Sequence, residues 1–260
     1  MSVEPSTGWG VTHLFFRLDR SRIDDAAGAG KAIVESIEAF EEGESNQALC
    51  FSVLGSRADF GVMAIGPDLD HLDSFRHQLS VAVGPGLVPA GSYVSLTELS
   101  EYSRTIDDER ATLEEDGIEP AEIESRLATF EERMAHYRHD RLYPKLPFRK
   151  VIAFYPMSKT RAPQANWFLM PYEERKRLMG GHARVGRRYA GRVLQLITGS
   201  VGLDDYEWGV TLVADDPVAI KEIVYEMRFD EVSAAYAEFG PFTVGLRLSP
   251  QDLVDRLRLH

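Results

Sequence analysis

The sequence is poor in cysteine, has no long apolar run and carries fewer basic than acidic residues. Cys50 is the single cysteine among 260 residues, which excludes an internal disulfide and a cysteine-rich metal site and favours a reducing compartment. No apolar stretch approaches the roughly 18 residues that a membrane-spanning helix needs. Residues 1–10 lack the basic start and apolar core of a signal peptide. We therefore expect a cytoplasmic protein without a membrane partner.

Several functional signatures are missing as well. With 29 Lys and Arg against 41 Asp and Glu, the net charge of −12 argues against a nucleic-acid partner. There is no phosphate-binding G-x-x-x-x-G-K, no dinucleotide-binding glycine fingerprint after a strand, and no G-x-S-x-G elbow. The remaining composition, 44% hydrophobic and 27% charged, is that of an ordinary globular protein with one large domain or two small ones.

The chain repeats one pattern of secondary structure. In the first half, β-rich runs and helical periodicity alternate over 11–17, 33–40, 48–54, 60–65, 68–81 and 93–99. In the second half they alternate over 150–155, 172–189, 192–198, 208–213, 216–229 and 242–248. Each half therefore has the order β-α-β-β-α-β, which is that of a ferredoxin-like unit. Two tandem units predict an α+β barrel with its helices outside.

The segment between the repeats is strongly charged and has the composition of a disordered linker. A helical stripe nevertheless recurs at i, i+4, i+7, i+11 and i+14, formed by Ile123, Leu127, Phe130, Met134 and Tyr137. This spacing predicts an amphipathic helix whose polar face is solvated. We expect an N-terminal unit over 1–106, a charged helical linker over 107–144 and a C-terminal unit over 145–260.

One region reverses the acidic balance of the chain. Residues 141–161 contain six Lys and Arg but no Asp or Glu, and the helix predicted over 172–189 adds six more against two Glu. Such a concentration of cations favours a site for an anionic small molecule. Composition alone explains it equally well as a solvated helix face with nearby loop cations.

His182 lies on the apolar stripe of that helix, together with Leu178, Val185 and Tyr189. A lone histidine in this position is more often a core residue than a metal ligand. No second ligand stands at a zinc-type spacing, which disfavours zinc. A single imidazole is sufficient, however, as the axial ligand of a haem iron, because the porphyrin supplies four nitrogens.

Tyr155 ends the strand predicted over 150–155 and precedes Pro-Met-Ser-Lys at 156–159. A tyrosine beside Lys159 and Arg161 could be an acid, a radical site or a hydrogen-bond partner. Taken by itself, it is interpreted as a rim tyrosine with its hydroxyl in solvent.

At these residues the sequence resembles the coproheme decarboxylases of the chlorite dismutase superfamily, in the form typical of Gram-positive spore-formers. The likeness covers most of the chain and is densest over 141–245. The matching stretches are Tyr-Pro-Met-Ser-Lys at 155–159, Asn-Trp at 166–167, the helix over 173–182, Gln-Leu-Ile-Thr-Gly-Ser at 195–200, Gly-Leu-Asp-Asp at 202–205, Glu-Trp-Gly-Val-Thr at 207–211 and the run over 225–233.

The resemblance implies a homopentamer that holds iron-coproporphyrin III in the C-terminal half of each chain. It implies His182 as the proximal iron ligand, Tyr155 as the catalytic, radical-forming residue, and Gln195 on the distal face where hydrogen peroxide binds. The implied contacts to the porphyrin are Arg141, Tyr155, Pro156, Met157, Ser158, Lys159, Gln195, Arg228 and Ser233, with Tyr143 lining the same pocket.

The implied reaction converts two propionates of iron-coproporphyrin III to vinyl groups and yields haem b. Hydrogen peroxide is the oxidant, and the step is the last one of coproporphyrin-dependent haem biosynthesis. The basic run at 141–161 suits a macrocycle with four carboxylates, because guanidinium and ammonium groups form charge-assisted hydrogen bonds with them. The chelatase that inserts the iron is an expected transient partner.

Two other functions are available to the same fold. The first is a haem peroxidase or chlorite dismutase; the resemblance argues against chlorite chemistry, because chlorite dismutases carry a distal arginine where this chain has Gln195. The second is a haem carrier or sensor without catalysis. Tyr155 beside Lys159 and Arg141 argues against it, because a carrier needs no oxidisable side chain next to the propionates.

Overall fold

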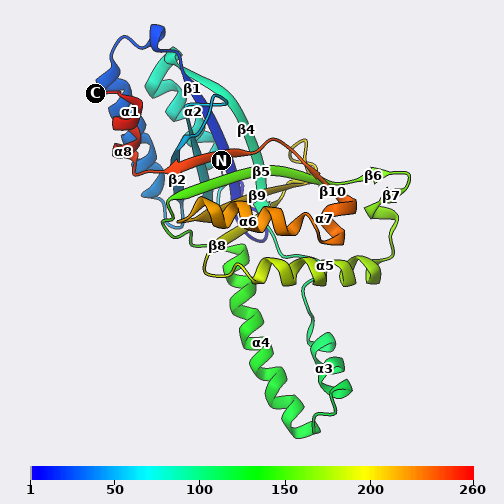
Figure 1. Cartoon of the computed structure of the whole chain (residues 1–260). Helices are drawn as coiled ribbons and strands as arrows, with labels where there is room; N and C mark the ends of the chain where they lie inside the picture. Colours follow the sequence, from blue (N-terminus) through cyan, green and yellow to red (C-terminus); the bar gives the residue numbers. More distant parts are fainter. Residues whose placement is uncertain (1) are drawn as a thin grey trace.

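The computed structural model describes residues 2–260 and contains the predicted repeat (Figure 1). The first half comprises β1 (Gly10–Leu18), α1 (Ala26–Glu41), β2 (Gln47–Val53), β3 (Phe60–Gly66), α2 (Leu69–Val83) and β4 (Leu87–Thr97). The second half comprises β5 (Val151–Lys159), the short β6 (Arg161–Ala162) and β7 (Ala165–Asn166), α5 (Tyr172–Arg187), β8 (Val193–Gly199), β9 (Trp208–Ala214), α6 (Pro217–Met227), α7 (Glu231–Tyr236), β10 (Ala237–Phe239) and β11 (Thr243–Arg247). The C-terminal α8 (Pro250–Leu257), which the sequence pattern did not predict, contacts α1.

The strands of both halves form one antiparallel sheet. Its order is β10-β5-β11-β2-β3-β1-β4-β8-β9, and β9 also pairs with β5, so the sheet closes on itself. Each half contributes four neighbouring strands, β2-β3-β1-β4 and β11-β5-β9-β8. The halves are joined where β11 pairs with β2 and where β4 pairs with β8. The fold is therefore α+β with a large antiparallel sheet.

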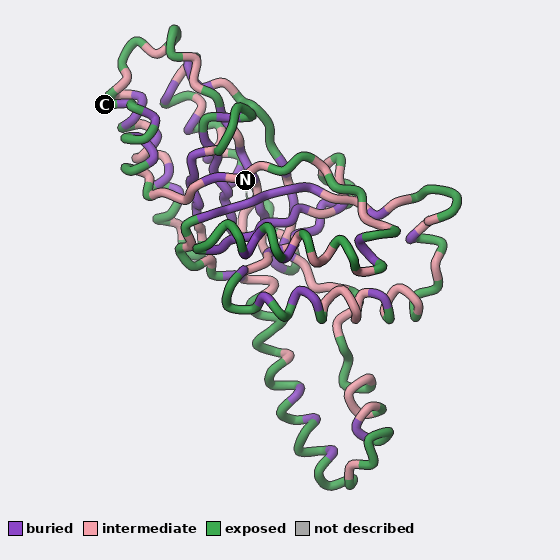
Figure 2. Tube along the Cα trace, viewed as in Figure 1, coloured by how far each residue is buried: buried purple, intermediate pink, exposed green. Residues whose placement is uncertain are grey.

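Three apolar clusters follow from this arrangement. One packs α1, α2 and α8 against the first-half strands, through residues such as Ile33 and Phe75. A second packs α6 against the outer face of β5, β8 and β9, through residues such as Leu212 and Ile223. The third joins strands of both halves without a helix and so fills the barrel interior. Figure 2 shows that buried residues are concentrated in these strands.

The barrel interior also holds a buried histidine. His13 is fully buried, its Nε2 lies 2.8 Å from Oγ1 of Thr211, and its ring stacks on Phe154 at 3.9 Å between centroids. Burial lowers the pKa of His13 to about 3, so the imidazole is neutral. It links β1 to β9 across the barrel and belongs to the core.

The segment between the repeats forms a helical hairpin of α3 (Ile106–Glu115) and α4 (Pro120–Leu142) that projects from the barrel (Figure 1). Leu113, Ile123 and Leu127 form its small apolar core, while most of its surface is exposed (Figure 2). The hairpin is tied to α5 by Lys176, whose Nζ lies 2.6 Å from Oδ1 of Asp108. The predicted amphipathic helix corresponds to α4.

Two boundaries differ from the sequence prediction. The strand with Tyr155 does not end there; β5 continues to Lys159, because its neighbour changes from β11 at Phe154 to β10 at Met157 and a proline is tolerated at that break. The helix expected over 216–229 ends at Met227, and α7 begins as a separate helix capped by Asp230. Among residues 2–260, no helix is both long and apolar enough to span a membrane.

Candidate functional site

The outer sheet face beneath α5 and α6 carries two of the predicted residues. Tyr155 on β5 pairs with Val210 on β9, which in turn pairs with Ile197 on β8. Because side chains alternate along a strand, Gln195 lies on the same face as Ile197. Gln195 donates from Nε2 to the carbonyl of Gly186 in α5 at 3.2 Å. The register therefore places Tyr155 and Gln195 on one face, under the helix that carries His182.

Tyr155 is buried in an aromatic and aliphatic setting. Only 5% of it is exposed, and its ring stacks on Phe242 at 4.3 Å between centroids and lies 5.7 Å from Phe239. Its hydroxyl makes no hydrogen bond within residues 2–260. Burial raises the pKa of Tyr155, which keeps the phenol protonated. The ring is therefore packed, while the hydroxyl oxygen is not among the fully enclosed unpaired atoms of residues 2–260.

Lys159, at the end of β5, is a buried cation without an anionic partner. It is 7% exposed, and its Nζ lies 4.8 Å from the ring centroid of Trp167. No carboxylate oxygen lies within ion-pair distance among the described residues. Burial lowers the pKa of Lys159 to about 8, against the opposing charges of Asp230 and Glu207. Nζ is not among the fully enclosed unpaired atoms of residues 2–260, so a bound anion can reach this cation and stabilise its charge.

His182 is oriented by a carboxylate from the start of α7. Its Nδ1 lies 3.0 Å from Oδ2 of Asp230, while Oδ1 of Asp230 accepts the backbone N–H groups of Val232 and Ser233 at 3.0 and 3.2 Å. Burial opposes ionisation of Asp230, but the hydrogen bonds from His182 and from Ser233 outweigh it, and the pKa of Asp230 is lowered. A carboxylate can only accept here, so Nδ1 carries the hydrogen and Nε2 is left as a ligand atom.

The end of α4 brings a further cation to this region. Arg141 donates from one terminal nitrogen to the carbonyl of Ile197 on β8 at 3.3 Å, and its Nε is buried without a partner within residues 2–260. Ser233 is also buried, in the first turn of α7. Asp230 thus connects His182, Ser233 and the charge of Lys159, while Arg141 lies by β8 and acts on the charge of Glu98.

Other predicted residues are placed as follows. Pro156 is buried, Met157 packs with the cluster under α6, and Ser158 accepts the backbone N–H of Glu207 at 3.2 Å. Arg228 is exposed after α6, and its side chain has no polar partner among the described residues. Tyr143 packs edge-on against Trp9 at 5.4 Å. Neither Arg228 nor Tyr143 makes a polar contact with the buried site.

Sequence reasoning missed Asp230 and Glu207. Asp230 lies in the family-like run over 225–233 and in the capping pattern Asp-Glu-Val-Ser, but neither pattern indicates the histidine opposite it. Glu207 opens the family-like stretch at 207–211, but no local pattern indicates its partner Lys159, which lies 48 residues earlier.

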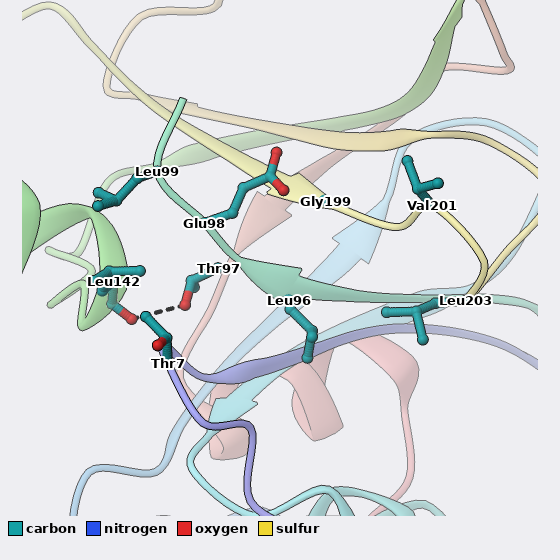
Figure 3. A pocket seen from close by; sticks show the side chains of 9 residues that line it. All are labelled: Thr7, Leu96, Thr97, Glu98, Leu99, Leu142, Gly199, Val201 and Leu203. Atoms are coloured by element: carbon teal, nitrogen blue, oxygen red, sulfur yellow. Dashed lines mark hydrogen bonds between the residues drawn. The ribbon is translucent and has the colours of Figure 1, made fainter. Parts of the chain in front are cut away.

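A hollow lies beside Gly199, the last residue of β8, whose partner Trp208 pairs in turn with Met157 of β5 (Figure 3). It has a volume of about 370 Å³ and is lined by Thr7, Leu96, Thr97, Glu98, Leu99, Leu142, Gly199, Val201 and Leu203. Most of these side chains are apolar and the one charged group is the carboxylate of Glu98, which accepts from Nε1 of Trp208 at 3.0 Å. Arg141 is the cation whose charge acts on Glu98, so the hollow adjoins one of the predicted porphyrin contacts.

The fold and these residues define an α+β barrel protein with a carboxylate-oriented histidine and a buried lysine that both lie near Asp230. Residues 26–248 match the model of the chlorite dismutase family, and the chain belongs to that family. Within residues 2–260 no three His, Cys, Asp or Glu side chains are grouped to hold a metal.

Relatives narrow the likeness further. The chain is 37% identical to a coproheme decarboxylase of Staphylococcus saprophyticus over 265 residues, covering 98% of both proteins. It is 40% identical to proteins of Natronomonas pharaonis and Haloquadratum walsbyi that are named as heme-binding proteins. The chain spans 40% and 47% of the length of these two proteins, which is less than half of each. A solved structure described as a novel heme-binding protein from Thermus thermophilus is 36% identical, with a TM-score of 0.78 over 100% of this chain and 99% of that one. These relatives support a haem-related function.

Proposed function

We propose that this protein is a coproheme decarboxylase, which converts iron-coproporphyrin III to haem b with hydrogen peroxide. The observation that carries the proposal is the buried ammonium of Lys159 without a counter-ion, on the same strand as a buried Tyr155 whose hydroxyl is free. The full-length likeness to a coproheme decarboxylase supports it. The strand order of each half, 2-3-1-4 in its own numbering, supports two ferredoxin-like units.

The polar groups present fit an anionic iron porphyrin. The Nε of Arg141 is buried without a partner among the described residues, and the ammonium of Lys159 lacks a carboxylate there. Coproporphyrin III brings four propionates, which would compensate such cations through charge-assisted hydrogen bonds. His182 offers Nε2 to the iron, and Asp230 holds the imidazole in the tautomer that this requires.

The bound iron porphyrin, on reaction with peroxide, supplies the oxidising equivalents. Tyr155 gives up the hydrogen atom of its hydroxyl and, as a phenoxyl radical, removes a hydrogen atom from the β-carbon of a propionate. Loss of carbon dioxide and one further electron leaves a vinyl group. For each vinyl group, two electrons and two protons reduce one hydrogen peroxide to two waters, and two rounds give haem b.

The surroundings of Tyr155 suit this role. Burial disfavours the phenolate, so the hydrogen remains on the oxygen until it is removed as an atom. The stacked ring of Phe242 fixes the phenol without accepting its hydrogen. Gln195 contributes an amide without charge to the same face, which supports peroxide over chlorite as the co-substrate.

The proposal is tested by product masses. Ligand-free protein is mixed with iron-coproporphyrin III and titrated with hydrogen peroxide. We expect the successive loss of one and then two carboxyl groups, each as carbon dioxide with two hydrogens. Tight binding without any decarboxylated product would instead identify a haem carrier. Rapid oxygen release from chlorite would identify a chlorite dismutase.

A further inference from the structure

Glu207 is a buried carboxylate at the start of β9 that contacts each residue of the 157–159 run. Its backbone N–H lies 3.1 Å from the carbonyl of Met157 and 3.2 Å from Oγ of Ser158. Its side-chain Oε2 accepts the backbone N–H of Lys159 at 2.8 Å. Only 7% of Glu207 is exposed. Glu207 therefore contacts the end of β5 from the β9 side, while β10 pairs with the same residues from the other side.

The other carboxylate oxygen has its own cation. Oε1 of Glu207 accepts a terminal nitrogen of Arg161, whose guanidinium lies over the ring of Phe168 at 4.3 Å. Arg161 belongs to the β6–β7 hairpin that follows β5. A buried carboxylate is stable only when it is paired and hydrogen-bonded, and Arg161 provides that compensation from the more exposed side.

The contact of Glu207 lies at the base of the Lys159 side chain. The backbone N–H of Lys159 donates to Glu207, and its side chain extends to the ring of Trp167. The charged groups nearest to the ammonium are Glu207 from β9 and Asp230 from the start of α7, and neither is within ion-pair distance.

We propose that Glu207 is a positioning residue for the porphyrin: it fixes the end of β5 so that the Lys159 ammonium meets a substrate carboxylate, and Arg161 is the counter-ion that makes this possible. The inference rests on the proposed function. In this role Glu207 does not contact the substrate itself and acts through Lys159. An amide cannot replace the carboxylate, because its NH2 group would face either the Lys159 N–H or the Arg161 guanidinium.

Glu207→Gln is the primary test, with affinity for iron-coproporphyrin III measured by absorbance titration without peroxide. We expect binding to weaken about tenfold, the usual effect of losing one charge-assisted contact. Asp215→Asn is the matched control. Asp215 also pairs with an arginine, Arg149, and with a backbone N–H, that of Lys150, but at the opposite end of β5. The control should bind within twofold of wild type.

A double-mutant cycle with Lys159→Met separates positioning from general stability. In the Lys159→Met background, adding Glu207→Gln should change affinity less than twofold, because there is no ammonium left to position. An equal loss in both backgrounds would overturn the inference, as would wild-type affinity of Glu207→Gln. Amide hydrogen exchange at Lys159 in the ligand-free protein should be faster in Glu207→Gln than in wild type; unchanged exchange also counts against it.

Arg161→Gln tests the same idea if Glu207→Gln does not fold. Arg161 has a side chain that is 60% exposed, so its replacement should leave the fold intact. We expect a loss of porphyrin affinity in the same direction, and unaltered affinity would contradict the inference. Failure of wild-type protein to bind iron-coproporphyrin III would instead refute the proposed function. Failure of the proposed function is therefore distinguished from failure of the inference on Glu207.

Discussion

The Nδ1 atom of His182 lies 3.0 Å from Oδ2 of Asp230, and the other oxygen of the same carboxylate caps α7. One side chain thus links the helix that carries the candidate iron ligand to the helix that carries Ser233. A partner of this kind fixes the ring orientation of a ligating histidine and increases its basicity.

Asp230→Asn should weaken the bond between the iron and His182. Asparagine retains the capping oxygen for α7, but its NH2 group cannot accept the Nδ1 hydrogen. We expect about 10- to 100-fold weaker axial ligation and a lower iron–histidine stretching frequency in the ferrous complex, measured by resonance Raman spectroscopy. Asp216→Asn, which caps α6 without a histidine partner, is the control. Equal frequencies in both variants and wild type would exclude the orienting role.

His182→Ala should remove the axial ligand altogether. The main absorption band of the bound porphyrin should shift or be lost, because the imidazole of His182 is the proposed iron ligand. An unchanged spectrum with normal turnover would show that the proximal ligand is a different residue.

Tyr155→Phe should bind iron-coproporphyrin III normally but produce no vinyl group. The hydroxyl has no hydrogen-bond partner in the described chain, so its removal should change the free energy of unfolding by no more than about 0.5 kcal/mol. Phenylalanine cannot form a phenoxyl radical, so peroxide should be consumed without decarboxylation. Mass analysis decides: haem b formed within a few-fold of the wild-type rate would refute the radical assignment.

The lowered pKa of Lys159 should change porphyrin affinity and the stability of the ligand-free protein in opposite directions as pH rises. Its ammonium is present below about pH 8 and lost above it, so porphyrin affinity should fall as pH rises through that value. Stability of the ligand-free protein should move the other way. The folded pKa lies below the ordinary value of 10.5, so between these limits only the unfolded chain binds the proton. The contribution of Lys159 to stability should rise there by up to about 1.4 kcal/mol per pH unit.

Lys159→Met isolates this effect from other titrating groups. The difference in unfolding free energy between wild type and variant should show the rise above pH 8, and the variant's porphyrin affinity should be weaker but flat with pH. A wild-type binding curve that does not bend between about pH 7 and 9 would rule out the ammonium as a substrate contact.

Gln195→Ala should impair the use of peroxide more than the binding of the porphyrin. The amide offers hydrogen bonds but no charge, so its loss should cost about 0.5–1.5 kcal/mol at the step it assists. Stopped-flow reaction with peroxide measures the first effect, and a separate titration with iron-coproporphyrin III measures the second. If binding falls and the peroxide reaction does not, Gln195 is a substrate contact only.

The order of helices and strands could be predicted from the sequence because it is a local property. Alternation at the β-runs and the i, i+4 stripe at Ile33 and Ile37 specify the elements without knowledge of their partners. Short ordered stretches such as 155–159 also indicated the family, and the match of residues 26–248 to the family model confirms it. The prediction that the strand ends at Tyr155 was wrong for a non-local reason. β5 continues through Pro156 because β10 continues the pairing, which no local pattern indicates.

An acidic chain with one cysteine, two similar halves and a basic run at 141–161 is specified by the order of residues alone. Which of these groups meet depends on the fold. The pairs His182–Asp230 and Lys159–Glu207 each join residues 48 positions apart, and Arg141 reaches β8 across 56. Such contacts depend on strand register and on how α5 and α7 pack over the sheet. These are set by the sum of many long-range contacts, which is why charge, burial and orientation at the site emerge only in the folded chain.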